Sequence, residues 1–216
     1  MLDAILNLDM DFFTSPPYFG RFYGKPEATS YSDFHATSSI WLDTKDFIAK
    51  LGLTHRIRGQ KMREDNQSFL YTREMINEKV VSPKRFTIVN FDSHHDCFIN
   101  WDENWFRSID GSLHSYDNMV APFLHEWVDE IIWVTPDYLT DEMYREQFRN
   151  MNITFQGDVA IVHISQSLKA RIHRIRWSDF NKESFNWKYF NLIINPEMSK
   201  ATPQMIESLS AFVSVF

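Results

Sequence analysis

The sequence predicts a three-layer α/β/α fold, in which helices cover both faces of a mostly parallel sheet. Short apolar runs without strict alternation are typical of strands that are buried on both faces. Segments with helical periodicity separate these runs along the chain. The length of 216 residues suits one domain spanning residues 1–216. Because 44% of the residues are hydrophobic, the chain can bury a core, and a disordered chain is excluded.

Five apolar runs are the predicted inner strands, and a sixth segment that alternates is predicted to be an edge strand. The runs cover residues 4–8, 86–91, 130–135, 159–164 and 190–195, and the alternating segment covers 171–177. Helical patterns cover residues 44–53, 66–79, 117–128, 140–151 and 202–216. The last helix has Thr202 as its expected N-cap and Pro203 at its first position.

The segment 14–43 is rich in Ser, Pro, Tyr and Phe and has no clear period. It predicts a long functional loop after the first strand. Elsewhere the chain shows no internal repeat or low-complexity tract.

Composition excludes several classes of protein. The net charge is −7, which argues against nucleic-acid binding because phosphate contacts need a basic surface. With Cys97 as its one cysteine, the chain has no internal disulfide framework and no multi-cysteine zinc site. No apolar stretch approaches the roughly 20 residues of a membrane span, and acids stand where a signal peptide has bases. We expect a cytoplasmic protein without membrane partners; a homo-oligomer stays open.

Acidic residues stand where three of the predicted strands end. The segments are "LDMDFF" (8–13), "FDSHHD" (91–96) and "INPEM" (194–198). In open α/β sheets, ligands bind beyond the carboxyl ends of the strands. Clustered carboxylates repel one another and are costly to desolvate, so a purely structural role is disfavoured.

The spacing of these acids predicts a metal site. Side chains two positions apart in extended chain point the same way, which groups Asp9 with Asp11, and Asp92 with His94 and Asp96. Four carboxylates and one imidazole suit Mn²⁺ or a similar divalent ion, and they can bridge two ions about 3.5–4 Å apart. The alternative is a set of surface-loop acids with a solvated histidine pair.

Two neighbours of this cluster have simpler interpretations. His95 lies between two candidate ligands, so extended geometry turns it away, and we expect it to pack. Cys97 is expected to be a small buried hydrophobic residue.

The two motifs resemble those of a known family. "FDSHHD" fits the D-x-H-x-D metal motif of the arginase and agmatinase group, the ureohydrolases, and "LDMDFF" resembles their D-x-D motif. With "NPEM" they look like a small arginase-related family that includes peptide arginases, which convert arginine in ribosomally made precursor peptides to ornithine and urea. The resemblance implies an arginase/deacetylase-like fold, two Mn²⁺ ions and an arginine-containing peptide as substrate. In arginase D-x-D follows D-x-H-x-D; here it comes first, which requires a rearranged strand order.

Carried over position by position, the resemblance implies a role for each ligand. Asp92 and Asp9 would bridge the two ions. His94 and Asp11 would complete the shell of one ion, and Asp96 would bind the other.

The remaining ligand of the arginase group is a histidine that opens a helix, and here its position falls on Asn66 in "REDNQSFLY" (63–71). An amide oxygen binds Mn²⁺ more weakly than an imidazole does, so we expect weak occupancy of that ion. Two explanations stay open: a naturally weaker site, or a histidine that has been replaced in this chain.

The resemblance also implies two residues for catalysis and substrate binding. His114, in "DGSLHSYDNMV" (110–120), resembles the histidine that protonates the leaving amine. Glu197 resembles the glutamate that holds the substrate guanidinium through a bidentate pair. The simpler alternatives are a surface-loop histidine and a residue on the approach to the last helix.

Two other functions stay open. "ILNLDMDFFT" (5–14) resembles the strand end of haloacid-dehalogenase-like phosphatases, with Asp9 as nucleophile, but Phe13 stands where that fold has Thr or Val. A metal-bound peptide-recognition module without turnover is the third hypothesis, and Asn66 in place of a histidine keeps it open.

Overall fold

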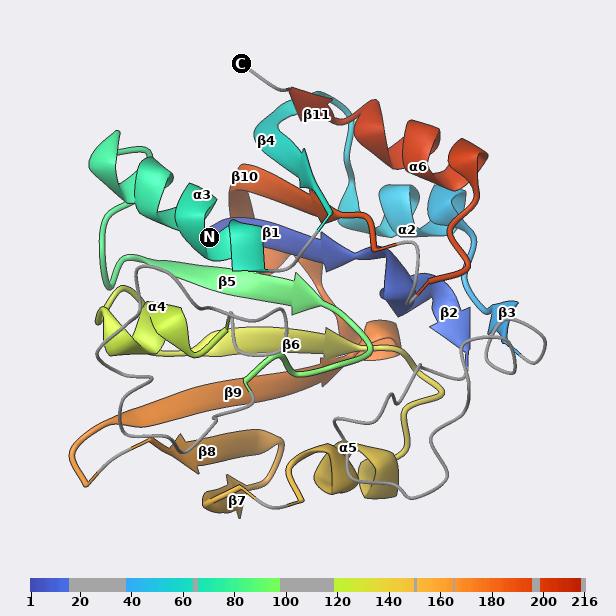
Figure 1. Ribbon diagram of the computed structural model, residues 1–216. Helices are drawn as coiled ribbons and strands as arrows, with labels where there is room; N and C mark the ends of the chain where they lie inside the picture. The colour runs from blue at the N-terminus through green and yellow to red at the C-terminus, as the bar shows by residue number, and fades with distance from the viewer. Residues whose placement is uncertain are drawn as a thin grey trace.

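In this computed structural model the described residues form a nine-stranded sheet with helices on both of its faces (Figure 1). The structure describes residues 1–15, 38–63, 66–97, 119–149, 151–164, 166–195 and 199–214, except for the side chain of Asn66. The predicted α/β class is therefore confirmed.

The strands lie in the order β11-β4-β10-β1-β5-β6-β9-β8-β7. All neighbours from β11 to β9 pair in parallel, whereas β8 is antiparallel to both β9 and β7. A separate antiparallel pair joins β2 to β3. The strand bounds are β1 Leu2–Asp9, β2 Thr14–Ser15, β3 Ser39–Ile40, β4 Ile57–Met62, β5 Phe86–Phe91, β6 Ile131–Thr135, β7 Ile153–Gln156, β8 Val159–His163, β9 Lys169–Arg176, β10 Phe185–Ile193 and β11 Val213–Ser214.

The sheet separates two hydrophobic cores. In β1 the side chain of Ile5 joins one core, and those of Leu6 and Leu8 join the other. Helices α3, α4 and α5 supply the core on the side of Ile5, and α2 and α6 supply the opposite core. The helix bounds are α2 Thr44–Leu51, α3 Asn66–Asn77, α4 Ala121–Leu124, α5 Asp141–Gln147 and α6 Pro203–Ser210; three 3₁₀ helices are η1 Met10–Phe13, η4 Trp177–Asp179 and η5 Lys182–Ser184.

The helix ends follow from local sequence. Asp43 accepts a hydrogen bond from the backbone of Lys45 at the start of α2, and Gly52 ends that helix in the left-handed conformation, with φ of 61°. Thr202 caps α6 through the backbone N–H of Met205, with Pro203 next, so both predictions for this helix start are confirmed.

Two predictions about elements were wrong. The segment predicted to be an edge strand forms β9, which lies between β6 and β8. Its alternating burial arises because Ala170, Ile172 and Arg174 are buried, whereas Lys169, Arg171 and Arg176 are exposed. The last predicted helix ends at Ser210, and Val213 then pairs with β4 as part of β11.

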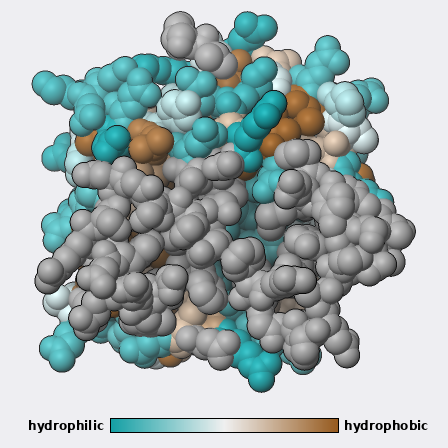
Figure 2. Space-filling view, viewed as in Figure 1, coloured by the Kyte–Doolittle hydropathy of each residue, from teal (hydrophilic) through white to brown (hydrophobic). Residues whose placement is uncertain are grey.

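The surface of the described residues carries few large apolar groups. Hydrophilic residues cover most of the coloured surface in Figure 2. The exposed large hydrophobic residues are Met1, Leu2, Ile40 and Leu70. In the part of the chain that the structure describes, no helix combines the length and apolar character needed to cross a membrane.

The α-helices that are described next after the neighbouring strands β1 and β5 lie on opposite faces of the sheet. The next α-helix described after β1 is α2, on one face, and the next after β5 is α4, on the other. In open α/β sheets, ligands bind at such a topological switch point, beyond the carboxyl ends of the strands. Two of the three acidic segments follow these two strands.

Candidate metal centre

The ends of β1 and β5 bring the two acidic motifs together. β1 ends at Asp9, and Leu8 is paired with Phe91, the last residue of β5. Asp11 lies one turn further on, in the 3₁₀ helix η1, where its backbone N–H donates to the Asp9 carboxylate at 2.7 Å. The predicted convergence is therefore confirmed, although a capped helical turn rather than an extended chain directs Asp11.

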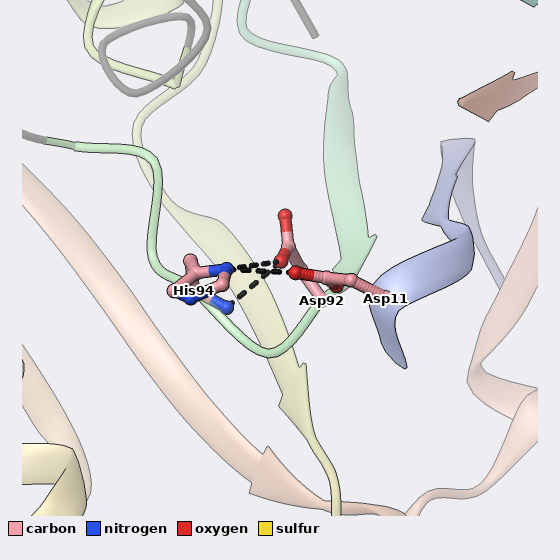
Figure 3. A group of neighbouring side chains, drawn as sticks. All are labelled: Asp11, Asp92 and His94. Atoms are coloured by element: carbon pink, nitrogen blue, oxygen red, sulfur yellow. Dashed lines mark hydrogen bonds and ion pairs between the residues drawn. The ribbon is translucent and has the colours of Figure 1, made fainter. Parts of the chain in front are cut away.

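Three of the predicted ligands form a tight, buried group. The Nδ1 atom of His94 lies 2.7 Å from Oδ2 of Asp11 and 3.7 Å from Oδ1 of Asp92. Ligand atoms of the three residues all lie within 4.8 Å of one another. Figure 3 shows the imidazole and the two carboxylates pointing toward one another, with Asp92 and His94 on the turn after β5 and Asp11 on η1.

Asp96 and Asp9 lie beside this group. Asp96 is buried, has a positive φ of 48°, and places its carboxyl group within hydrogen-bonding reach of Asp92. The charge of Asp9 acts on both His94 and Asp96. The structure thus gathers all five predicted ligands of these two strand ends in one buried region.

This concentration of charge changes the proton affinity of the ligands. Burial, the adjacent Asp92 carboxylate and the field of Asp9 raise the pKa of Asp96 well above its usual value. Burial alone would lower the pKa of His94, but the facing carboxylates, Asp11 foremost, outweigh it and raise that pKa. Both shifts favour the protonated forms of these two side chains.

The donor set could hold a divalent cation. Two ligands about 2.1 Å from one ion and at right angles lie about 3 Å apart, and the distances of 2.7 and 3.7 Å from Nδ1 bracket this value. Carboxylate oxygens with one imidazole suit Mn²⁺ better than the sulfur-preferring ions. Asp11, Asp92 and His94 are the residues that would hold an ion.

His95 points away from the centre and packs, as predicted. Its ring stacks on Phe148 with 4.3 Å between centroids. Nε2 donates to the carbonyl oxygen of Gln147 at 3.0 Å, and Nδ1 accepts from the backbone N–H of Cys97 at 2.8 Å. Because burial disfavours the charged form of this ring, the pKa of His95 falls to about 4. Cys97 is buried, as predicted.

A second layer of polar groups fixes the turn that carries the ligands. Ser93 donates its backbone N–H to Asp11 Oδ1 at 3.2 Å, and its Oγ lies 3.0 Å from the hydroxyl of Tyr138. Gln147 donates from Nε2 to the carbonyl oxygen of Ser93 at 2.9 Å. The sequence reasoning missed Tyr138, although it follows the carboxyl end of β6, where site residues of this fold class gather.

Three of the predicted site residues cannot be placed. His114 and Glu197 lie outside the described residues. Asn66 is the first residue of α3, consistent with a helix-opening position, but its side chain lies outside the described part.

The chemistry of the centre is inferred from its donor atoms. Comparisons of the chain with protein-family models, with curated proteins and with solved structures returned no match.

Proposed function

We propose that this chain is a manganese-dependent hydrolase of the arginase type. It acts on arginine side chains of a precursor peptide, adds water to the guanidino carbon, and leaves ornithine in the peptide with release of urea. The observation that carries the proposal is the buried group of Asp11, Asp92 and His94, with Asp9 and Asp96 beside it.

The sheet order supports this proposal. Because β1 and β5 are neighbours, a D-x-D motif and a D-x-H-x-D motif meet at one edge of the sheet. Their reversed order along the chain is therefore compatible with an arginase-like sheet. The position at the switch point supports it further, since ligands of parallel sheets bind there.

Each chemical role falls to a named side chain. When bound, the ions would neutralise the carboxylates and lower the pKa of water at the site. In the proposal Glu197 pairs with the guanidinium of the substrate and His114 returns a proton to the leaving amine of ornithine. The chain's net charge of −7 favours a cationic substrate.

A urea assay on a defined peptide tests the proposal. The protein is reconstituted with Mn²⁺ and incubated with an arginine-containing peptide, or with the same peptide carrying lysine instead. We expect urea and ornithine in equal amounts from the first peptide only. Urea is measured enzymatically, and the peptide is analysed by mass spectrometry.

The controls separate this function from its alternatives. Asp92→Asn removes a central ligand and is expected to abolish urea release, whereas Asp3→Asn, at the other end of the neighbouring β1, should preserve it. Phosphate release from an aryl phosphate without urea would favour the phosphohydrolase. Peptide binding without any product would favour the recognition module.

A variant at Asn66, the predicted weak ligand, tests whether the chain binds a second ion. If Asn66 occupies a ligand position, Asn66→His will raise both the manganese content per chain and the rate of urea release. Elemental analysis of the purified protein measures the first quantity. An unchanged manganese content would remove Asn66 from the centre.

A further inference from the structure

A row of buried amides lies directly beneath the metal centre. Asn7 on β1 is paired with Asn191 on the neighbouring strand β10 and with Asn90 on the other neighbour, β5. Alternation along each strand places all three on the face of Ile5, Ile88 and Tyr189. Their exposed fractions are 1%, 0% and 1%, so these groups are shielded from bulk water.

We propose that Asn90 is a positioning residue for the Asp92 carboxylate and that Asn7 acts through Asn90. The inference rests on the proposed metal centre and extends it to two residues that would not touch the ion. Asn7 donates from Nδ2 to Oδ1 of Asn90, and Asn90 donates from Nδ2 to Oδ2 of Asp92 at 3.2 Å. The hydrogen bonds therefore run in one direction, from the middle of the sheet to the ligand.

Asp92 is held from several sides. Its other carboxylate oxygen, Oδ1, accepts the backbone N–H of His94 at 2.8 Å. Its carbonyl oxygen accepts the indole N–H of Trp133 at 2.9 Å. With at least one donor on each carboxylate oxygen, rotation of the carboxylate would break a hydrogen bond. Of these three, Asn90 supplies the side-chain donor to the carboxylate itself, whereas the side chain of Trp133 donates to the backbone carbonyl.

The row is not arranged for stability. The Oδ1 atoms of Asn7 and Asn191 are buried and have no hydrogen-bond donor among the described residues. Unpaired buried acceptors destabilise a fold, and aliphatic side chains would avoid that penalty. Residues that lower the stability of a fold are expected mainly at functional sites.

The choice of an amide at position 90 also has a chemical reason. A carboxylate of the same size would offer Asp92 a second negative charge and no donor. An amide orients Asp92 by hydrogen bonding and adds no charge to a centre that already holds four carboxylates. Supporting groups of this kind change metal affinity by about 10–100-fold when they are removed.

Manganese affinity, measured by titration calorimetry on the folded protein, tests the inference without reference to activity. We expect Asn90→Leu to bind Mn²⁺ about 10–100-fold more weakly than the wild type. Asn90→Asp keeps the size of the side chain and an acceptor for Asn7, and it adds negative charge. If Asn90 positions Asp92, this variant also loses affinity; if the centre needs only charge, the variant gains affinity and the inference is overturned.

A double-variant cycle tests the role of Asn7. If Asn7 acts only through Asn90, Asn7→Leu weakens binding by less than Asn90→Leu does, and the double variant binds no more weakly than Asn90→Leu alone. Additive losses would overturn this part of the inference. Should a leucine variant fail to fold, Asn90→Asp and Asn7→Ser keep the row polar and carry the same comparison.

The control is Thr87→Val on the same strand. Thr87 is buried and donates to the carbonyl oxygen of Glu130 at 2.9 Å, at the opposite end of β5 from the centre. The Thr87→Val substitution should lower the melting temperature and leave the manganese affinity unchanged. If the Asn90 variants keep the manganese affinity of the wild type, as Thr87→Val should, the role of Asn90 is overturned and the proposed function is untouched. If the wild type itself binds no Mn²⁺, both the role of Asn90 and the proposed function are overturned.

Discussion

His94 and His95 are adjacent in sequence and opposite in chemistry. The His94 imidazole faces Asp11 across 2.7 Å, and its pKa is raised by the surrounding carboxylates in spite of burial. The His95 imidazole stacks on Phe148 as a neutral ring with both nitrogens bonded. The alternation of an extended chain predicted this separation, and the turn after β5 preserves it.

At the residue scale, removing one charge from the central group should weaken metal binding. Asp11→Asn keeps the size of the side chain and the hydrogen-bonding capacity toward His94, but it replaces an anionic ligand with a neutral one. We expect the Mn²⁺ dissociation constant to rise at least about 100-fold, beyond the effect of a supporting group. Titration calorimetry measures it, and Asp3→Asn is the matched control. Equal affinities in the two variants would contradict this prediction.

His95 makes a separate prediction about acid stability. Its pKa is lowered to about 4 in the folded protein, and the ordinary value is 6.5. Between these values the unfolded chain binds the proton more readily, so the free energy of unfolding falls as the pH decreases from 6.5 toward 4. The full shift corresponds to about 3 kcal/mol.

The comparison with His95→Gln isolates this contribution. Urea denaturation of the metal-free proteins at pH 7, 5.5 and 4 gives the free energies of unfolding. We expect the difference between wild type and variant to shrink at the lower pH, because the variant lacks the ring that must stay neutral. A difference that is constant over this range would show that His95 does not titrate as described.

At the scale of elements, the pairing of β4 with β10 depends on Gly59. A Cβ atom at this position would lie 2.1 Å from the carbonyl oxygen of Phe190. Because the obstructing atom belongs to the backbone of the neighbouring strand, the strands would have to separate. We expect Gly59→Ala to lower the free energy of unfolding by about 3 kcal/mol or more.

The control for this prediction is a glycine with open surroundings. Gly157 has a φ of 62°, and nothing lies within 4 Å of the Cβ position. Gly157→Asn should therefore change stability by less than about 1 kcal/mol, since asparagine tolerates the left-handed conformation. Thermal denaturation compares the two variants, and similar losses would contradict the role assigned to Gly59.

The elements that the sequence predicted well are those with continuous apolar runs. The segments 86–91 and 130–135 became β5 and β6, because helices cover both sheet faces there. β4 was missed because its sequence, "IRGQKM", mixes charged and apolar residues. β11 was missed because two residues form too short a strand for any periodicity, and only its pairing with β4 defines it.

At the scale of the whole molecule, the candidate centre was predictable to the extent that it follows from strand ends. Asp9, Asp92 and His94 could be proposed because ligands gather at the carboxyl ends of parallel strands. The adjacency of β1 and β5 could not be predicted, because strand order depends on crossovers that no local pattern encodes. The role of Asn90 could not be predicted either, because it depends on residues of two other strands that pair beside it.

Metal binding should stabilise the whole chain. An ion that binds the folded state alone, at a free concentration 100 times its dissociation constant, adds about 2.7 kcal/mol to the free energy of unfolding. For a chain of this size we expect the melting temperature to rise by about 5–10 °C. Differential scanning fluorimetry with Mn²⁺, and again after excess chelator, measures the shift.

Asp11→Asn separates stabilisation by Mn²⁺ bound at the centre from stabilisation by Mn²⁺ bound elsewhere on the chain. Its melting temperature should respond to Mn²⁺ far less than that of the wild type at the same concentration. A response of equal size in both proteins would mean that the ion stabilises the chain from another place.

The meeting of β1 with β5 has a consequence for how the molecule holds together. The hydrogen bond from the backbone N–H of Ser93 to the Asp11 carboxylate already joins residues 82 positions apart. An ion held by Asp11, Asp92 and His94 would act as a cross-link of the same span, comparable to a disulfide that closes a long loop. The first strand of the protein would then be fastened to its middle, and backbone amides of β1 would exchange with solvent more slowly whenever the ion is present.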